Sequence, residues 1–145
     1  MTGELLKAIK TRWAAKSLTS TFTGGIVDGP PISGTTWPMV FCDVVGAAMT
    51  GRAPSVTENK FQQYETATVD FTIRAKTGLA AMSTLAEALK TAFDNAAMAL
   101  GSSVTLLRFW YQGESHAADP DHPNVWDWTV TYKAEMEQSK TLVGA

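Results

Sequence analysis

The sequence has a single cysteine, no long apolar run and no excess of basic residues. One cysteine excludes an internal disulfide bond. No apolar segment approaches the roughly 20 residues that a membrane-spanning helix needs. The first residues, Met1–Glu4, lack the basic segment and the apolar core of a signal peptide. We therefore expect a soluble protein that is made in a cytoplasm and does not bind a membrane.

The charge balance is nearly neutral, with a net charge of −2 over 145 residues. Proteins that bind nucleic acid through its phosphates carry a surplus of lysine and arginine. The total charge therefore does not indicate affinity for nucleic acid.

Motifs that carry chemistry are also scarce, since there is no glycine-rich phosphate loop, no nucleophile elbow and no cysteine pair for zinc. The best candidate is the segment from His116 to His122, in which Asp119 and Asp121 add two carboxylates to the two imidazoles, as a divalent metal site requires. This segment is rich in proline and lacks the scaffold that normally fixes metal ligands. We predict a solvated hairpin loop, with no metal, no cofactor and no catalytic residue.

The pattern that is present centres on a strand followed by a helix. From Ala67 to Ala75, apolar residues alternate with polar ones, as in a strand with one buried face. From Leu79 to about Ala97, apolar residues recur every three or four positions, as in an amphipathic helix. This helix should cover the strand through Met82, Leu85, Leu89 and Phe93.

Other segments extend this unit in both directions. We predict an amino-terminal helix from about Gly3 to Lys16, a brief edge strand at Ile26–Val27 and an apolar strand from Pro38 to Val45. Apolar Cys42 should be a buried thiol within that strand. Two further strands, Val104–Gln112 and Trp126–Met136, form a hairpin around the polar loop Gly113–Asn124. Trp126 and Trp128 share their face with Val130 and Met136, so they belong to the core.

These elements predict one domain over residues 1–145. The expected fold class is α+β: a two-layer sandwich in which a long helix covers a mainly antiparallel sheet of four to five strands, with an additional amino-terminal helix. Residues 138–145 have no core-forming pattern and are expected to be a flexible tail.

The segment from Gly46 to Gln63 has no apolar period and is predicted to be a long loop. Loops of this length in a small domain are usually functional. Large aromatic residues and arginine are enriched at protein interfaces. We therefore predict a contact surface that includes residues of this loop and of the strand after the long helix: Arg52, Phe61, Tyr64, Arg108 and Trp110.

The order of these elements, with the segments Ile26-Val-Asp-Gly-Pro-Pro and Trp37-Pro-Met-Val-Phe, resembles the tail-terminator, or tail-completion, proteins of long-tailed bacteriophages. The resemblance covers about residues 3–137. It implies a virion structural protein without enzymatic activity that is assembled in the host cytoplasm and lies at the tail–neck junction. Its subunits would form a ring, commonly a hexamer, that caps the tail tube and joins it to the head.

The partners implied by this resemblance are other copies of the chain, the tail tube protein and a head–tail connector or stopper protein, while DNA passes through the lumen without specific binding. Two alternatives remain open. One is another phage head–tail connector, stopper or tube subunit. The other is a small enzyme domain that binds a ligand or metal, which would need a concave pocket with convergent polar groups.

Overall fold

The computed structural model describes residues 1–31, 36–54, 60–122 and 124–141, and gives only the backbone for 47–54, 60, 61, 140 and 141. The sheet of this part has six strands in the order β1-β2-β3-β6-β5-β4. In chain order the strands are β1 (Ile26–Asp28), β2 (Met39–Pro54), β3 (Lys60–Lys76), β4 (Ala99–Gly101), β5 (Val104–Ala118) and β6 (Val125–Thr141). The helices are α1 (Thr2–Ala15), the short 3₁₀ turn η1 (Leu18–Ser20) and α2 (Leu79–Phe93).

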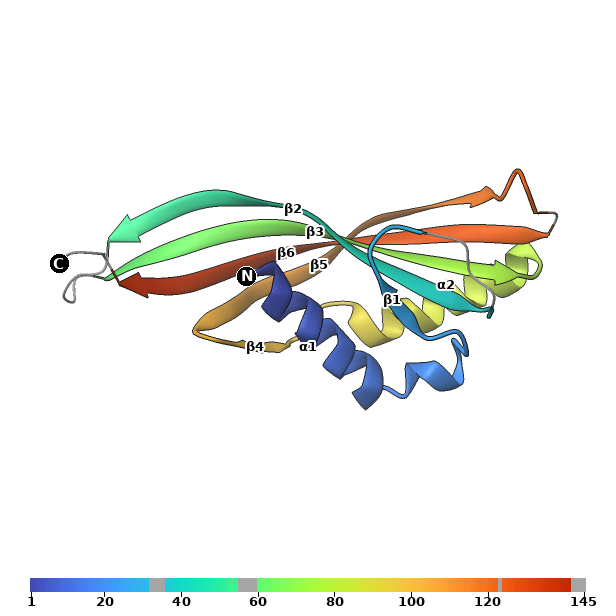
Figure 1. The fold of residues 1–145 in the computed structure, drawn as a ribbon, viewed down its shortest axis with the longest axis horizontal. Coiled ribbons are helices and arrows are strands. Elements are labelled where there is room, and N and C mark those ends of the chain that lie inside the picture. Colours follow the sequence, from blue (N-terminus) through green and yellow to red (C-terminus); the bar gives the residue numbers. More distant parts are fainter. Residues whose placement is uncertain (32–35, 55–59, 123, 142–145) are drawn as a thin grey trace.

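The predicted sandwich with a long covering helix is wrong. Strands account for 50% of the structure, and the six-stranded mixed sheet curls into a half-barrel (Figure 1). Its first strand, β1, runs parallel to β2, while the other neighbours are antiparallel. The 15 residues of α2 extend for about 22 Å, whereas the 17 residues of β3 extend for about 55 Å. The helix is therefore too short to cover the sheet.

The alternating strand patterns are confirmed by burial. Ala67, Val69, Phe71 and Ile73 of β3 are all fully buried, and so are Val130, Tyr132, Ala134 and Met136 of β6. Trp128 is buried and Trp126 is half-buried against the same core, as their parity predicted. One face of the two central strands therefore builds the core.

Helices α1 and α2 both lie against this buried face (Figure 1). Helix α1 buries one stripe of apolar side chains spaced three or four residues apart, and helix α2 buries a similar stripe. The Nε–H of Arg12 in α1 donates a 2.6 Å hydrogen bond to the carbonyl oxygen of Ala92 in α2, which joins the two helices. Helix α2 ends at Phe93, before the predicted Ala97, and Asn95 follows with a left-handed φ of 51°.

Tyr132 stands at the centre of the core and connects three elements. Its ring stacks on Phe109 of β5 at 4.8 Å and meets Phe71 of β3 edge-on at 5.8 Å. Its hydroxyl donates a 2.5 Å hydrogen bond to Asp94, directly after α2. Because a buried hydroxyl needs a partner, this bond also fixes the end of α2 against the sheet.

Three predicted boundaries differ from the structure. The supposed loop Gly46–Gln63 is mostly strand, because β2 continues to Pro54 and β3 begins at Lys60. The polar hairpin loop is shorter than predicted, since β5 runs on to Ala118. Strand β6 continues to Thr141, so the first part of the expected tail pairs with β3.

Leu89→Ala tests the packing of α2. Leu89 is fully buried, so removing most of its side chain should lower the free energy of unfolding by about 2–5 kcal/mol. Leu79→Ala is the matched control, because Leu79 is on the same helix but is 41% exposed. Its cost should stay within about 0.5 kcal/mol, as for other surface substitutions. Equal costs for the two variants in urea unfolding would contradict this placement of the helix.

Candidate functional site

Strand β5 presents a long free edge. It pairs with β6 along its length, but on its other side β4 reaches only Val104 and Thr105. From Leu106 to Ala118, no strand in the described part of the chain lies on that side, which leaves about 40 Å of edge at the usual rise per residue. Unpaired backbone N–H and C=O groups along such an edge can accept another strand.

Strand β2 presents the second free edge, on the opposite side of the sheet. Strand β1 covers only Val40–Cys42, and the N–H of Gly29 bonds to the carbonyl oxygen of Cys42. Beyond that point, from Asp43 to Pro54, β2 has no neighbour on its outer side among the described strands. The sheet therefore has two long edges that can accept a partner.

The exposed apolar side chains coincide with these two edges. Among the described residues, four large hydrophobic side chains are exposed: Val45, Leu79, Leu107 and Tyr111, by 45%, 41%, 48% and 41%. Three of the four are on β2 or β5. Exposed apolar side chains on an open edge mark a site of association, because pairing there removes apolar surface and unpaired backbone groups from water together.

Both edge strands are bent by irregularities, whereas the central pair is regular. The register of β2 against β3 shifts between Val45 and Ala48 and between Met49 and Gly51. The register of β5 against β6 shifts between Leu106 and Arg108 and between Tyr111 and Gly113. No such shift interrupts β3 and β6. Bulges bend a strand and increase its twist, so they favour the observed curl of the sheet.

Two of the predicted contact residues form a pair on β5. The guanidinium carbon of Arg108 lies 4.3 Å from the centre of the Trp110 ring, which is the geometry of a cation–π contact. Arg108 is exposed and Trp110 is half-buried. Their neighbours across the strand are Glu135 and Lys133 of β6. Because the two residues are two positions apart in a strand, their side chains lie on one face of the sheet.

The other three predicted residues belong to an extension of the sheet that we call the arm: Gly51–Pro54 of β2, Lys60–Tyr64 of β3 and Glu137–Thr141 of β6 (Figure 1). The arm projects beyond both helices. Tyr64 is half-buried, and with Leu107 and Glu135 it lines a hollow of about 210 Å³. The side chains of Arg52 and Phe61 lie outside the described part. The role of all five residues in contacts stays a prediction.

Lys90 anchors α2 to the free edge of β5. Its ammonium nitrogen lies 2.7 Å from a carboxylate oxygen of Glu87 and 3.0 Å from one of Glu114, and the Tyr111 hydroxyl donates a 2.9 Å hydrogen bond to Glu114. Hydrogen bonds to Glu87 and Glu114 raise the pKa of Lys90. Burial raises the pKa of Glu114, but the hydrogen bonds from Lys90 and Tyr111 and the Lys90 charge outweigh it and lower that pKa overall.

Sequence reasoning did not predict this cluster, because Lys90 and Glu114 are far apart in the chain and both are residue types that are common at protein surfaces. The cluster matters for the edge because it holds exposed Tyr111 in place.

Glu114→Gln tests the cluster through its pH dependence. The pKa of Glu114 is below its usual 4.5 in the folded protein, so its stabilisation is present above that value and is lost as the pH falls through the lowered pKa. At pH 6 the variant should be less stable by about 0.5–1 kcal/mol, as for partly exposed ion pairs. The difference should shrink at about pH 3. For the control Ser115→Ala, the difference in stability from the wild type should not change with pH. If the difference for Glu114→Gln is also the same at both pH values, Glu114 does not stabilise the fold through its charge.

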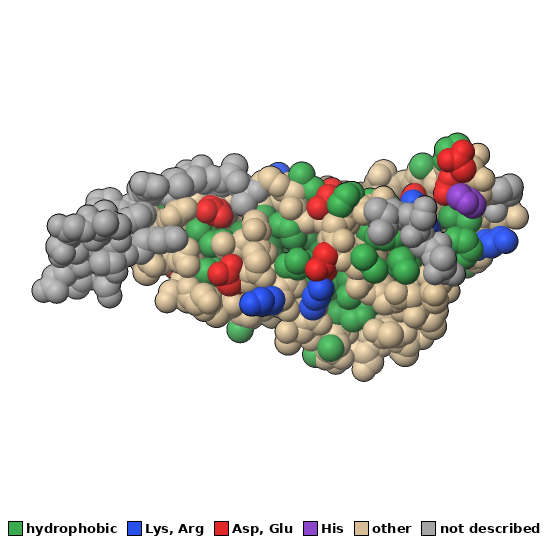
Figure 2. Space-filling model, in the orientation of Figure 1, with side chains coloured by type: hydrophobic (Ala, Val, Ile, Leu, Met, Phe, Trp, Pro, Cys, Tyr) green, Lys and Arg blue, Asp and Glu red, His purple; other side chains and the backbone are tan. Residues whose placement is uncertain are grey.

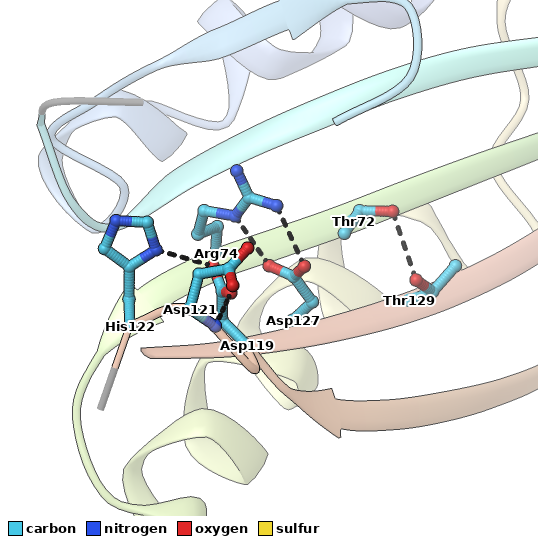
Figure 3. Close-up of polar contacts among 7 residues, drawn as sticks. All are labelled: Thr72, Arg74, Asp119, Asp121, His122, Asp127 and Thr129. Atoms are coloured by element: carbon cyan, nitrogen blue, oxygen red, sulfur yellow. Dashed lines mark hydrogen bonds and ion pairs between the residues drawn. The ribbon is translucent and has the colours of Figure 1, made fainter. Parts of the chain in front are cut away.

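A cleft of about 620 Å³ lies at the end of the sheet opposite the arm, where carboxylates and a histidine gather (Figure 2). Its lining includes the ion pair between Arg74 and Asp127, whose two hydrogen bonds measure 2.8 and 2.9 Å (Figure 3). Asp119, which also lines the cleft, accepts a hydrogen bond from the N–H of Asp121 and lies 3.2 Å from Nδ1 of His122. These contacts fold the turn between β5 and β6.

The four candidate metal ligands do not form one site, because His116 lies apart from the other three. His116 lies on β5 and stacks on Trp128 at 4.8 Å, whereas His122 belongs to the turn. Among the described residues, no group of three or more histidine, cysteine, aspartate or glutamate side chains is arranged to hold a metal ion. Cys42 is buried, as predicted, and burial raises the pKa of its thiol to about 12. No described helix is long and apolar enough to cross a membrane.

Titration with zinc, manganese and magnesium tests the prediction that this turn binds no metal. Because the two imidazoles are held by different elements, we expect no stoichiometric binding in calorimetry, and the same heats from a variant with His116→Ala and His122→Ala. A one-to-one site of micromolar affinity that this double variant loses would favour the alternative of a metal-binding enzyme domain.

Comparison with known proteins identifies the fold. No family model and no curated protein matches the chain. Among solved structures, a chain in the virion of a native gene transfer agent particle superimposes with a TM-score of 0.68 at 15% identity, over 94% of this chain and 96% of that one. A second solved protein, known by a sequence identifier alone, gives a TM-score of 0.51 at 16% identity over 94% of both chains. At these identities the likeness shows a shared fold.

Proposed function

We propose that the chain is a structural protein of a phage-like virion, and that it acts there as a tail terminator. The observation that carries the proposal is the likeness to a chain of a gene transfer agent virion over nearly the whole length of both chains. Two proteins that share an architectural role but have diverged to low sequence identity are expected to match in fold over their whole length, and not only in a local motif. The order of elements, which resembles tail terminators, supports the narrower role.

In this role several copies, commonly six, form a ring that caps the tail tube and joins it to the neck. Structural rings need surfaces that bind neighbouring copies, and the two free edges and their exposed apolar side chains supply them. The function is not enzymatic in this proposal. The arm and the pair Arg108–Trp110 are the surfaces that we assign to contacts with neighbouring copies, the tail tube protein and the connector or stopper.

The face of the sheet that points away from the helices suits the wall of a DNA channel. It carries hydroxyl and carboxyl groups that bond to one another: Thr131 donates a 2.7 Å hydrogen bond to Asp70, and Thr72 and Thr129 are 3.1 Å apart. Its cations are accompanied by carboxylates: Arg74 is paired with Asp127, and Arg108 is opposite Glu135 of β6. A wall of this mixed kind has no excess of positive charge for phosphates, which suits a channel that DNA passes without being held.

The main alternative is another connector, stopper or tube subunit of the same kind of particle. The likeness in fold does not separate these roles. Their assemblies differ, however: a tube subunit polymerises along an axis, whereas a terminator stops at a closed ring.

The proposal predicts a closed ring from purified protein. Light scattering should give a mass several times 15.6 kDa, and electron microscopy should show rings. Added to tail tubes of its own particle, the protein should bind one tube end only. Long tubes formed by the protein alone would identify a tube subunit instead. A protein that stays monomeric at all accessible concentrations and does not bind tubes would refute the role.

A further inference from the structure

We propose that the free edge of β2 in one copy pairs with the free edge of β5 in the next copy, so that every joint of the ring is an antiparallel β2–β5 ladder. The inference rests on the proposed ring and deepens it by naming the surface that binds the second copy. It follows from three features of the described strands: their direction, their two uncovered edges and the position of the exposed apolar side chains.

Strand direction makes this joint antiparallel. The four long strands are adjacent in the order β2-β3-β6-β5, and each pair is antiparallel. Because their number is even, the outermost two run in opposite directions. A rotation about an axis roughly along the strands keeps these directions, so β2 of one copy meets an oppositely directed β5 of the next. Antiparallel strands can pair through their backbone groups without reversing the direction of either copy.

Closure favours joining unlike edges. Two copies related by a two-fold axis would pair β5 with β5 or β2 with β2, and each such dimer would leave the other edges uncovered. Joining β2 to β5 uses both edges of every copy and repeats by rotation until the ring closes. The curl of the sheet turns each copy in the same direction, as closure requires (Figure 1).

The exposed side chains fit this joint. Following the registers across the sheet, Val45 of β2 is level with Thr68, Lys133 and finally Trp110 of β5. A neighbour set at the same level would place its Trp110 beside Val45 on the face away from the helices, with Leu107 of the same strand nearby, while its Tyr111 lies on the helix side beside Lys90. If the strands are tilted relative to the ring axis, the two edges pair at a shifted register, and this row of side chains moves along the edge by the same shift.

Lysine substitutions on each edge test the joint. Val45→Lys changes the β2 edge and Leu107→Lys changes the β5 edge, at side chains exposed enough for the fold to tolerate the change. Lysine on an edge opposes strand addition. Each variant should need at least about tenfold more protein to form rings, the effect of about 1.4 kcal/mol at each joint. The matched control is Leu79→Lys, equally exposed but on α2, which should assemble as the wild type does.

Mixing the two variants gives the decisive result. Leu107→Lys retains a native β2 edge and Val45→Lys retains a native β5 edge, so the mixture has one native joint and should form dimers at protein concentrations at which each variant alone is still monomeric. Circular dichroism and thermal unfolding confirm that both variants fold, and a variant that does not fold is replaced by Val45→Thr or Leu107→Thr, with the same pattern expected on a smaller scale.

Other outcomes overturn the inference. Normal assembly of Val45→Lys together with loss for Leu107→Lys indicates pairing of β5 with β5. Normal rings from both variants, or equal loss in the Leu79→Lys control, show that the joint lies elsewhere, and the proposed function then stands without it. If the wild type forms no ring at all, both the joint and the proposed function fall.

Discussion

The pairing of β3 with β6 is the constraint on which the rest of the structure depends. The two strands match residue for residue from Lys76 opposite Val125 to Lys60 opposite Thr141, with no register shift. On one face they supply most of the core, and on the other they are tied by Arg74 with Asp127, Thr72 with Thr129 and Asp70 with Thr131. A slip by one residue would turn every one of these side chains to the wrong face. Packing and polar contacts therefore specify the same register.

The position of this pair at the centre determines what lies outside it. Strands β2 and β5 add to either side, and their own outer neighbours, β1 and β4, are three residues long. The outer edge of β2 and that of β5 are thus left mostly without a partner in the described chain. The regular centre makes the sheet stable, while the bulged outer strands give it curvature and leave the edges for other copies.

The parts predicted from sequence are those governed by burial on one face. The alternation in Ala67–Ala75 and Trp126–Met136 follows directly from a face against the core. The segment Gly46–Pro54 has no such alternation. Its glycines and proline disfavour a strand, but pairing with β3 holds the segment in a strand conformation. Leu107 and Phe109 are two residues apart, so a regular strand would place them on one face, but the bulge between Leu106 and Arg108 leaves Leu107 exposed and Phe109 buried.

The candidate site was predicted only in part, for a related reason. A spacing of two residues was enough to place Arg108 and Trp110 together. The free edges could not be predicted in this way. Whether a strand has a free edge depends on the strands beside it, and the outer neighbours β1 and β4 are too short to show an alternating pattern in the sequence. Likewise, nothing in the local sequence links Lys90 to Glu114, whose contact exists only because α2 packs on the sheet within reach of β5.

The separation of the two central strands along the chain has a consequence for how the protein is made. Strand β3 ends at Lys76 and β6 begins at Val125, so these two paired residues are 125 − 76 = 49 positions apart in the chain. At a synthesis rate of about 5–20 residues per second, β3 emerges roughly 2–10 seconds before its partner. Helix α2 and the β2–β3 hairpin, which need only local contacts, can form in that interval. Until β6 emerges, α1 and α2 are the helices available to cover the apolar side of β3.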